Sequence, residues 1–271
     1  MGNSHFDELL QSADPDRRLA ALFAPADARA RLFALYAFNH EIGKIAEATS
    51  EGMIGEMKLT WWRDAVEDIY AAEPRVRRHD VAEGLAGLAG RIGREDIMAL
   101  IDARIDDVRA RPFASLDEIL AYVDATAGRL MRLALRLCEA ELDEATLRAA
   151  GRAWGLTGLL RAFPVRAQIG RAPVGGDDLQ RAGATPAMLA QGLGEAKVAE
   201  AVQPVRQAAQ TAIADLRAAR PLPAEAVPAA GYALLARAYL ANLPDRPYLI
   251  GPDRPLLFRQ ARLTWLSLTG R

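Results

Sequence analysis

Apolar residues recur at three- and four-residue intervals along most of this chain, and this spacing restricts it to helical architectures. Between residues 28 and 49 they fall on one helix face: Leu32, Leu35, Phe38 and Ile42. The chain has 55 alanines but only 32 valines, isoleucines and threonines combined. Alanine loses no side-chain entropy in a helix, whereas β-branched residues lose χ1 freedom. Because no segment alternates as a strand does, the sequence predicts an all-α fold.

The same spacing predicts where the helices lie. They are expected at residues 28–49, 53–70, 94–108, 116–138, 144–161, 195–219, 230–243 and 255–268. Ser115 with Glu118 predicts a capping box, and Thr185 before Pro186 predicts an N-cap. Residues 166–180 are rich in Gly, Pro and Arg and are expected to form a loop.

Length and charge place the chain among ordinary globular proteins. Its 271 residues with 51% hydrophobic content suit a single domain spanning residues 1–271, and a net charge of −1 gives no reason to expect nucleic acid. The single cysteine, Cys138, excludes an internal disulfide and fits a reducing compartment. No apolar run reaches the roughly 18–20 residues of a membrane span. The expected location is cytoplasmic.

Several short motifs follow one another in a distinctive order. They are LYAF at 35–38, WWR at 61–63, WGLTGLLR at 154–161 and GR at 170–171. Together they resemble the squalene/phytoene synthase family, whose members join two prenyl diphosphates head to head. The resemblance implies a helical bundle of the isoprenoid-synthase type around a central cavity. It also implies magnesium held by two aspartate-rich motifs.

The first of those metal motifs is degenerate here. Gly43 and Lys44 stand where the family carries two acids, while Glu47 is the one retained carboxylate and Glu41 lies a turn and a half before it. Carboxylates four residues apart share a helix face and can hold a hard cation such as Mg²⁺. Glycine and lysine cannot do this.

The second metal motif is lost as well. Ala162 and Arg166 occupy the positions of its aspartates, and neither residue can bind a cation. Loss of both motifs predicts that metal-dependent ionisation of a diphosphate has been abandoned. We therefore expect no catalytic residue, no bound metal and no cofactor, with Mg²⁺ required only if the chain is an active enzyme after all.

Further phrases resemble one branch of the family. They are AFNHE at 37–41, VEDIY at 66–70 and LRAFP at 160–164. That branch comprises mitochondrial assembly factors of respiratory complex I related to phytoene synthase, which also lack the aspartates. The resemblance implies a non-catalytic assembly factor or lipid-binding helper, with complex I subunits or assembly intermediates as partners. The alternative is an active head-to-head prenyltransferase using farnesyl or geranylgeranyl diphosphate.

If this fold holds, four cations are expected near the cavity mouth: Lys44, Arg161, Arg166 and Arg171. A basic mouth over an apolar cavity suits an isoprenoid or the headgroup of an anionic lipid. The alternative is ion pairing, with Glu41, Glu47 or Asp177 as the partners.

Other acidic pairs have helical spacing but are interpreted as solvated faces. They are Asp64 with Asp68, Asp102 with Asp106, and Glu41 with Glu47 and Glu51. The three histidines share no ligand spacing, so zinc is not expected. The tail 254–271 has four arginines, no acid and several large apolar residues, which suits either docking on the bundle or peripheral contact with the inner membrane.

Overall fold

The computed structural model describes residues 2–48 and 52–270, and within them it contains helices and no strand, which confirms the all-α prediction. The first half comprises α1 (Gly2–Ala13), α2 (Pro15–Ala21), α3 (Ala26–Gly43), α4 (Gly52–Tyr70), α5 (Asp80–Ala86), α6 (Arg94–Asp102), α7 (Ile105–Val108), α8 (Leu116–Val123), the π-helical turn η1 (Asp124–Gly128) and α9 (Arg129–Leu137). The second half comprises α10 (Glu144–Arg161), α11 (Phe163–Gln168), α12 (Gly176–Arg181), α13 (Pro186–Ala190), α14 (Glu195–Ala201), α15 (Gln203–Ala218), η2 (Ala224–Ala226), α16 (Val227–Ala230), η3 (Gly231–Leu235), α17 (Ala236–Leu240) and α18 (Leu256–Thr269).

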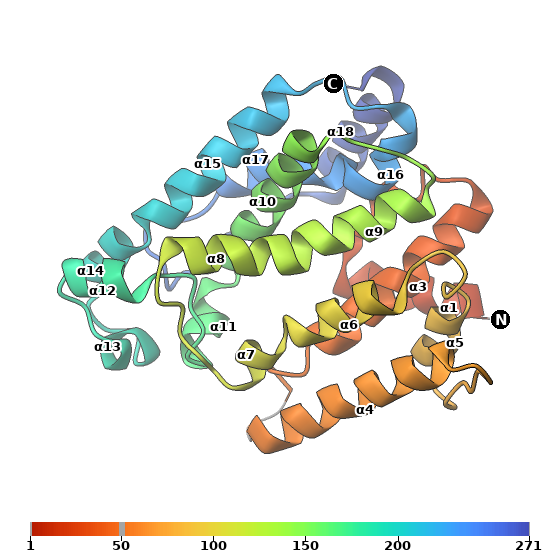
Figure 1. Cartoon of the computed structure of the whole chain (residues 1–271). Coiled ribbons are helices and arrows are strands. Elements are labelled where there is room, and N and C mark those ends of the chain that lie inside the picture. Colours follow the sequence, from red (N-terminus) through yellow and green to blue (C-terminus); the bar gives the residue numbers. More distant parts are fainter. Residues whose placement is uncertain (1, 49–51, 271) are drawn as a thin grey trace.

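Helix α10 is the central element of the bundle. It packs against α15, α17 and the rod formed by α8, η1 and α9, while α3, α4 and α6 lie on the other side of that rod (Figure 1). One apolar core joins the N-terminal helices to α9 and the C-terminal elements. A second core joins α8 and α10 to α11–α15. Because α10 contributes to both cores, its position fixes the walls of the space between them.

Two glycines let α10 approach the rod closely. A Cβ at Gly151 would lie 2.8 Å from the Cα of Gly128, and a Cβ at Gly155 would lie 2.5 Å from Val123 Cγ1. Neither distance is compatible with a side chain, so α10 meets the backbone of η1 at Gly151 and the side chain of Val123 at Gly155. Single π turns of this kind are frequent at functional sites.

The helix predictions were correct in type but several boundaries were wrong. The helix expected at 28–49 ends at Gly43, and the one expected at 94–108 breaks after Asp102 into α6 and α7. The helix expected at 195–219 breaks into α14 and α15 just before Pro204, because proline has no N–H to donate within a helix. The loop expected at 166–180 includes the short helix α12.

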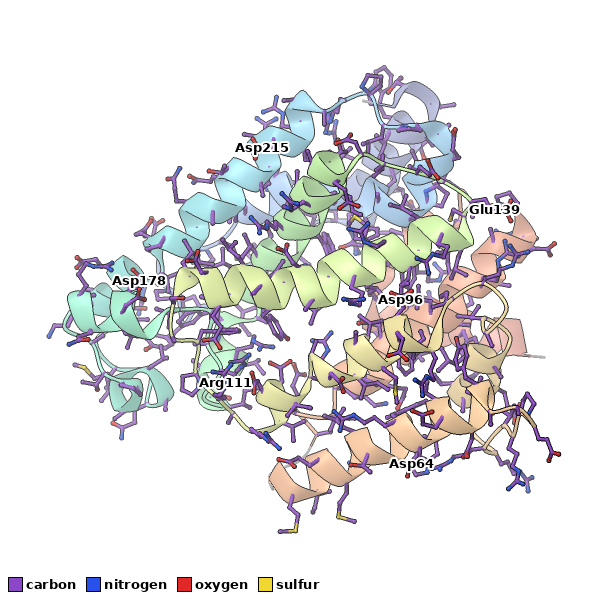
Figure 2. All side chains as sticks on the ribbon, viewed as in Figure 1. Asp64, Asp96, Arg111, Glu139, Asp178 and Asp215 are labelled. Atoms are coloured by element: carbon purple, nitrogen blue, oxygen red, sulfur yellow. The ribbon has the colours of Figure 1, made fainter. Side chains whose placement is uncertain are left out.

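Ion pairs tie the rod to its neighbours. Asp96 at the start of α6 accepts hydrogen bonds from Arg129 Nη1 at 3.2 Å and Arg136 Nη1 at 2.8 Å, both on α9 (Figure 2). One of the two hydrogen bonds of the predicted capping box forms. Ser115 Oγ accepts from Glu118 N–H, but the Glu118 carboxylate accepts from Ala114 N–H instead of Ser115 N–H.

Within residues 2–48 and 52–270, none of the helices combines the length and the hydropathy required to cross a bilayer.

Candidate functional site

The two degenerate motifs line one cavity. Its volume is about 450 Å³, and its walls come from the α1–α2 junction, the end of α3, Arg104, the α8–η1 segment and α10. The motif positions in this lining are Gly43, Lys44, Glu47, Ala162 and Arg166. Larger hollows of about 1020 and 620 Å³ contain none of these positions, so size alone does not identify the site.

An arginine covers the glycine of the first motif. A Cβ at Gly43 would lie 3.8 Å from Arg104 Nη2, so the guanidinium group packs directly against this position. Arg104 also donates to the Tyr122 hydroxyl at 2.8 Å and to Asn39 Oδ1 at 3.3 Å. A positive group therefore occupies the wall where the family places acids.

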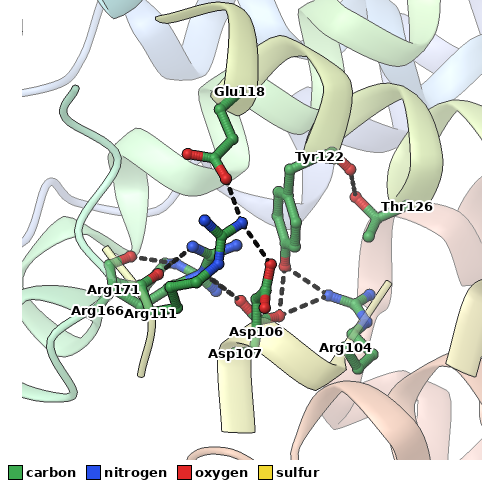
Figure 3. Close-up of polar contacts among 9 residues, drawn as sticks. All are labelled: Arg104, Asp106, Asp107, Arg111, Glu118, Tyr122, Thr126, Arg166 and Arg171. Atoms are coloured by element: carbon green, nitrogen blue, oxygen red, sulfur yellow. Dashed lines mark hydrogen bonds and ion pairs between the residues drawn. The ribbon is translucent and has the colours of Figure 1, made fainter. Parts of the chain in front are cut away.

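Asp107 is the centre of the polar network below the cavity (Figure 3). Its Oδ1 accepts from Arg166 Nη2 at 2.7 Å and from Arg171 Nε at 3.2 Å. Its Oδ2 accepts from the Tyr122 hydroxyl at 2.5 Å, and Arg104 Nη1 lies 3.4 Å away. Only 4% of the Asp107 side chain is exposed. One buried carboxylate is thus shared by three guanidinium groups, which leaves a net positive charge in this network.

The charge state of Asp107 follows from these contacts. Burial by itself would raise the pKa of this carboxyl, but the charges of Arg166 and Arg104 and the hydrogen bond from Tyr122 outweigh burial, so its pKa lies below the ordinary value of 3.8. Burial raises the pKa of Tyr122. At neutral pH Asp107 is therefore ionised and Tyr122 is a neutral donor.

The remaining cations of the cavity are also paired. Lys44 Nζ lies 2.5 Å from Glu41 Oε1, and Arg17 Nη1 lies 2.6 Å from Asp14 Oδ2. The Arg17 guanidinium is buried among aromatic rings and lies 5.0 Å from the centroid of Tyr232. Each cation therefore already has a carboxylate partner that would share it with a bound anion.

These residues do not fit a magnesium cluster. Four cations, Arg17, Lys44, Arg104 and Arg166, face four carboxylates, Asp14, Glu41, Glu47 and Asp107. Three of the carboxylates are held by those cations, and only Glu47 has no such partner. Among the residues that the structure describes, no three potential ligands of the His, Cys, Asp or Glu type gather around one point. Because Mg²⁺ requires several free oxygen ligands, the donor set does not suit it.

The expected convergence of four cations at the cavity mouth was wrong for two of them. Arg171 is only 1% exposed, and its guanidinium lies 3.7 Å from the centroid of the Phe113 ring. Arg161 lies 2.5 Å from Asp253 and stacks 3.9 Å from the centroid of the Tyr239 ring. Neither arginine lines the cavity, because Arg171 is buried against Asp107 and Phe113, whereas Arg161 reaches Asp253. Lys44 and Arg166 do line it.

The ion pairs expected as the alternative do form, partly with other acids. Glu41 holds Lys44 as expected, whereas Arg166 and Arg171 meet at Asp107 and Arg161 meets Asp253. The other acidic pairs also find arginine partners in the structure. Asp68 accepts from Arg77, Asp102 from Arg63 and Asp106 from Arg111. Glu51 lies outside the described residues.

Sequence reasoning missed four residues that shape this site: Arg17, Arg104, Asp107 and Tyr122. Asp107 directly follows Asp106 in the sequence, and neighbouring residues point to different helix faces. That divergence is real, since Asp106 faces Arg111 at the surface while Asp107 faces the interior. The available signal was Arg104 three residues before Asp107, at a spacing that allows an ion pair on a helix.

Comparison with known proteins identifies the family. The profile of the squalene/phytoene synthase family matches residues 10–267. A dehydrosqualene synthase solved with a ligand superposes with a TM-score of 0.79 at 16% identity, covering 98% of this chain and 95% of that one. A squalene synthase from Alicyclobacillus acidocaldarius superposes with a TM-score of 0.72 at 20% identity, covering 89% and 92%. These two structures share the fold.

Curated relatives fall into two groups. The NADH dehydrogenase (ubiquinone) complex I, assembly factor 6 of Homo sapiens is 29% identical over 60% of this chain and 50% of its own length. The presqualene diphosphate synthase of Rhodopseudomonas palustris is 32% identical over 59% and 58%. The chain thus spans about half the length of the curated relatives it matches. From the profile match over nearly its whole length, the chain belongs to the squalene/phytoene synthase family.

Proposed function

We propose that this chain is a non-catalytic family member that helps to assemble respiratory complex I, with its cavity retained to bind an isoprenoid or a lipid headgroup. The observation that carries the proposal is the composition of the cavity wall. The two motif positions face one space, and they present Gly43, Lys44, Ala162 and Arg166 there. Ionising an allylic diphosphate requires metal ions to neutralise the departing charge, and these side chains offer no ligand for one.

The electrostatic balance of the cavity supports the same proposal. Lys44 and Arg166 could in principle replace the metal by binding the diphosphate directly. Both cations already meet carboxylates, at 2.5 Å for Lys44 with Glu41 and 2.7 Å for Arg166 with Asp107. A diphosphate would compete with those carboxylates for the same cations, so a neutral or singly charged headgroup fits the wall better. This refines the sequence-based expectation of a basic, anion-binding mouth.

The relatives support both the proposal and its alternative. Assembly factor 6 proteins match at 28–30% identity and presqualene diphosphate synthases at 26–32%. An active prenyltransferase therefore stays the second candidate, favoured by the preserved fold and cavity. The loss of the metal ligands weighs against it.

We expect no release of pyrophosphate when the protein is incubated with farnesyl or geranylgeranyl diphosphate, with Mg²⁺ or Mn²⁺, and with or without NADPH. The physical reason is the absence of a ligand set for the metal that the leaving group requires. Glu47→Gln removes the single carboxylate retained from the first motif, and we expect no release of pyrophosphate from this variant either. Turnover that a chelator and Glu47→Gln both abolish would establish the enzyme and end the non-catalytic proposal.

Binding is tested in the same samples. Gly158 lines the cavity and a Cβ there would meet nothing within 4 Å, so Gly158→Ala adds a methyl group without a clash and Gly158→Leu extends a larger apolar side chain from the cavity wall. If the cavity holds an isoprenoid, farnesol should raise the melting temperature of the wild type and of Gly158→Ala, but not that of Gly158→Leu. Equal increases of the melting temperature in all three proteins would show that farnesol binds outside this cavity.

Deleting the gene is expected to lower the NADH:ubiquinone oxidoreductase activity of membranes together with the amount of assembled complex I. Both the wild type and Glu47→Gln should restore them, because the proposed role needs no metal chemistry. Succinate oxidation in the same membranes is the control. Unchanged complex I activity and abundance after deletion would contradict the assembly role.

A further inference from the structure

Helix α18 has one face fixed to the bundle. Leu263 and Leu266 are buried, and Arg259 Nη1 lies 3.0 Å from Asp16 Oδ1 on α2. The helix packs against α2 and η3 at the same end of the molecule as α16 (Figure 1). Docking on the bundle, one of the two roles considered for this tail, therefore accounts for the face of α18 that carries Leu263 and Leu266.

The opposite face of α18 is apolar and exposed. Leu257 and Leu268 are each 78% exposed and Trp265 is 58% exposed. With Phe258 and Arg262 these residues lie on one broad side of the helix, spanning about 140° at 100° per residue, away from Leu263 and Leu266. Seven of the fifteen large apolar side chains exposed in the described chain lie between residues 249 and 268. Such a concentration marks an interaction surface.

Arginines gather beside this face. The Leu222 N–H donates to the Gly270 carbonyl at 2.9 Å, which brings the segment after α15 against the end of α18. The arginines grouped there are Arg217, Arg220, Arg237 and Arg262. Burial lowers the pKa of Arg220, and the positive charges of the other three lower it further.

This group lacks acidic partners. Within residues 2–48 and 52–270, none of its four arginines makes an ion pair or a side-chain hydrogen bond, and Arg220 Nε is buried without an acceptor. The sequence contains no acid after Asp253. The whole chain carries a net charge of only −1, so the positive charge near α18 is local and does not reflect an excess of basic residues in the chain. Mutual repulsion among four guanidinium groups is relieved when they meet an external anion.

We infer that the outer face of α18 and the four neighbouring arginines form a docking surface for a bilayer that contains anionic lipids. An interfacial helix buries aliphatic and tryptophan side chains at the headgroup boundary while flanking arginines meet lipid phosphates. The exposed apolar residues stand side by side on the outer face of one helix with the arginines beside them, which suits a planar, deformable surface better than a folded acidic protein. The surface lies apart from the central cavity, so lipid docking depends neither on the cavity ligand nor on a role in complex I assembly.

The test is co-sedimentation of the full chain with vesicles of phosphatidylcholine alone or of phosphatidylcholine with phosphatidylglycerol. We expect binding only to the anionic vesicles, weakening as salt is raised. Each arginine near an anionic surface is worth about 1 kcal/mol, so Arg217→Gln, Arg237→Gln and Arg262→Gln together should weaken binding on the order of 100-fold. The matched control, Arg75→Gln with Arg78→Gln, removes two exposed arginines from the α4–α5 loop and should bind nearly as the wild type does.

Fluorescence distinguishes a bilayer from a soluble anion. Trp265 should shift to shorter wavelength on binding and be quenched by brominated lipid, and Trp265→Phe should abolish that signal while keeping most of the binding. Absence of wild-type binding to anionic vesicles would overturn the inference, as would equal binding of the triple arginine variant. Arginine-dependent binding without any change at Trp265 would overturn it too, and would indicate a soluble anionic partner. Far-UV circular dichroism of each variant verifies that the bundle is folded.

Discussion

Replacing Asp107 by asparagine is expected to lower the free energy of unfolding by about 3–5 kcal/mol. Arg166 and Arg171 are 10% and 1% exposed, and both rely on the Asp107 carboxylate as their ionic partner. The substitution keeps the shape of the side chain but removes its charge. It therefore leaves the buried guanidinium groups without a counter-charge. A buried charge without a partner destabilises the folded state by more than the intact ion pair stabilises it. Denaturation by urea, followed by circular dichroism, measures the difference.

The effect of Asp107→Asn should depend on pH in a defined direction. The pKa of Asp107 lies below its ordinary value of 3.8 in the folded protein, so the unfolded chain binds this proton more readily. The stabilisation is therefore complete above pH 3.8 and is lost as the pH falls through the folded pKa. The gap in stability between wild type and variant should be constant from pH 5 to 7 and should narrow in stronger acid.

Asp106→Asn is the matched control. It removes the same charge from the adjacent position, where the side chain is 35% exposed and pairs with Arg111 at the surface. An exposed pair of this kind contributes about 0–1 kcal/mol. Equal losses for the two variants would show that the buried network does not hold the α7–α11 region together.

Gly151→Ala is expected to destabilise the fold by about 1–3 kcal/mol although alanine is the better helix former. The new Cβ would lie 2.8 Å from the Cα and 3.3 Å from the N of Gly128. Both groups are backbone atoms within helical segments, so relief requires α10 and η1 to move apart. Chemical denaturation measures this loss, and the cavity between these elements should change shape with it.

Gly158→Ala provides the comparison within the same helix. Its Cβ would meet nothing within 4 Å, so only the helix propensity changes and the stability should rise by as much as about 1 kcal/mol. Opposite signs for the two alanine variants would confirm that close approach, and not flexibility, requires the glycine at 151. A loss at both positions would contradict that explanation.

Periodic sequence features predicted the helical class and most of the helices. The α10 boundaries at Glu144 and Arg161 agree with the spacing of apolar residues and with the proline that follows at 164. Boundaries failed where tertiary contacts intervene. Residues 116–138 were expected as one regular helix, but they contain the π turn η1, against which α10 packs through Gly151 and Gly155.

The identities at the metal-motif positions were legible from the sequence because they depend on residue type alone. Gly43 and Ala162 cannot ligate a cation in any conformation. The sequence did not show whether the four cations meet at the mouth of the cavity, and that prediction was wrong for two of them. Arg171 is buried under Phe113, and Arg161 turns to Asp253.

The sequence by itself determined the fold class, the family and the loss of both metal motifs, since periodicity and residue chemistry are local properties. Only the tertiary structure decided which charges meet. Asp107 lies 59 residues from Arg166 and 64 from Arg171 along the chain, and no local spacing encodes such pairs. The packing of α7 against the α10–α11 corner brings these groups out of water together. Burial then makes their pairing obligatory, because an isolated charge in the interior costs far more than a paired one.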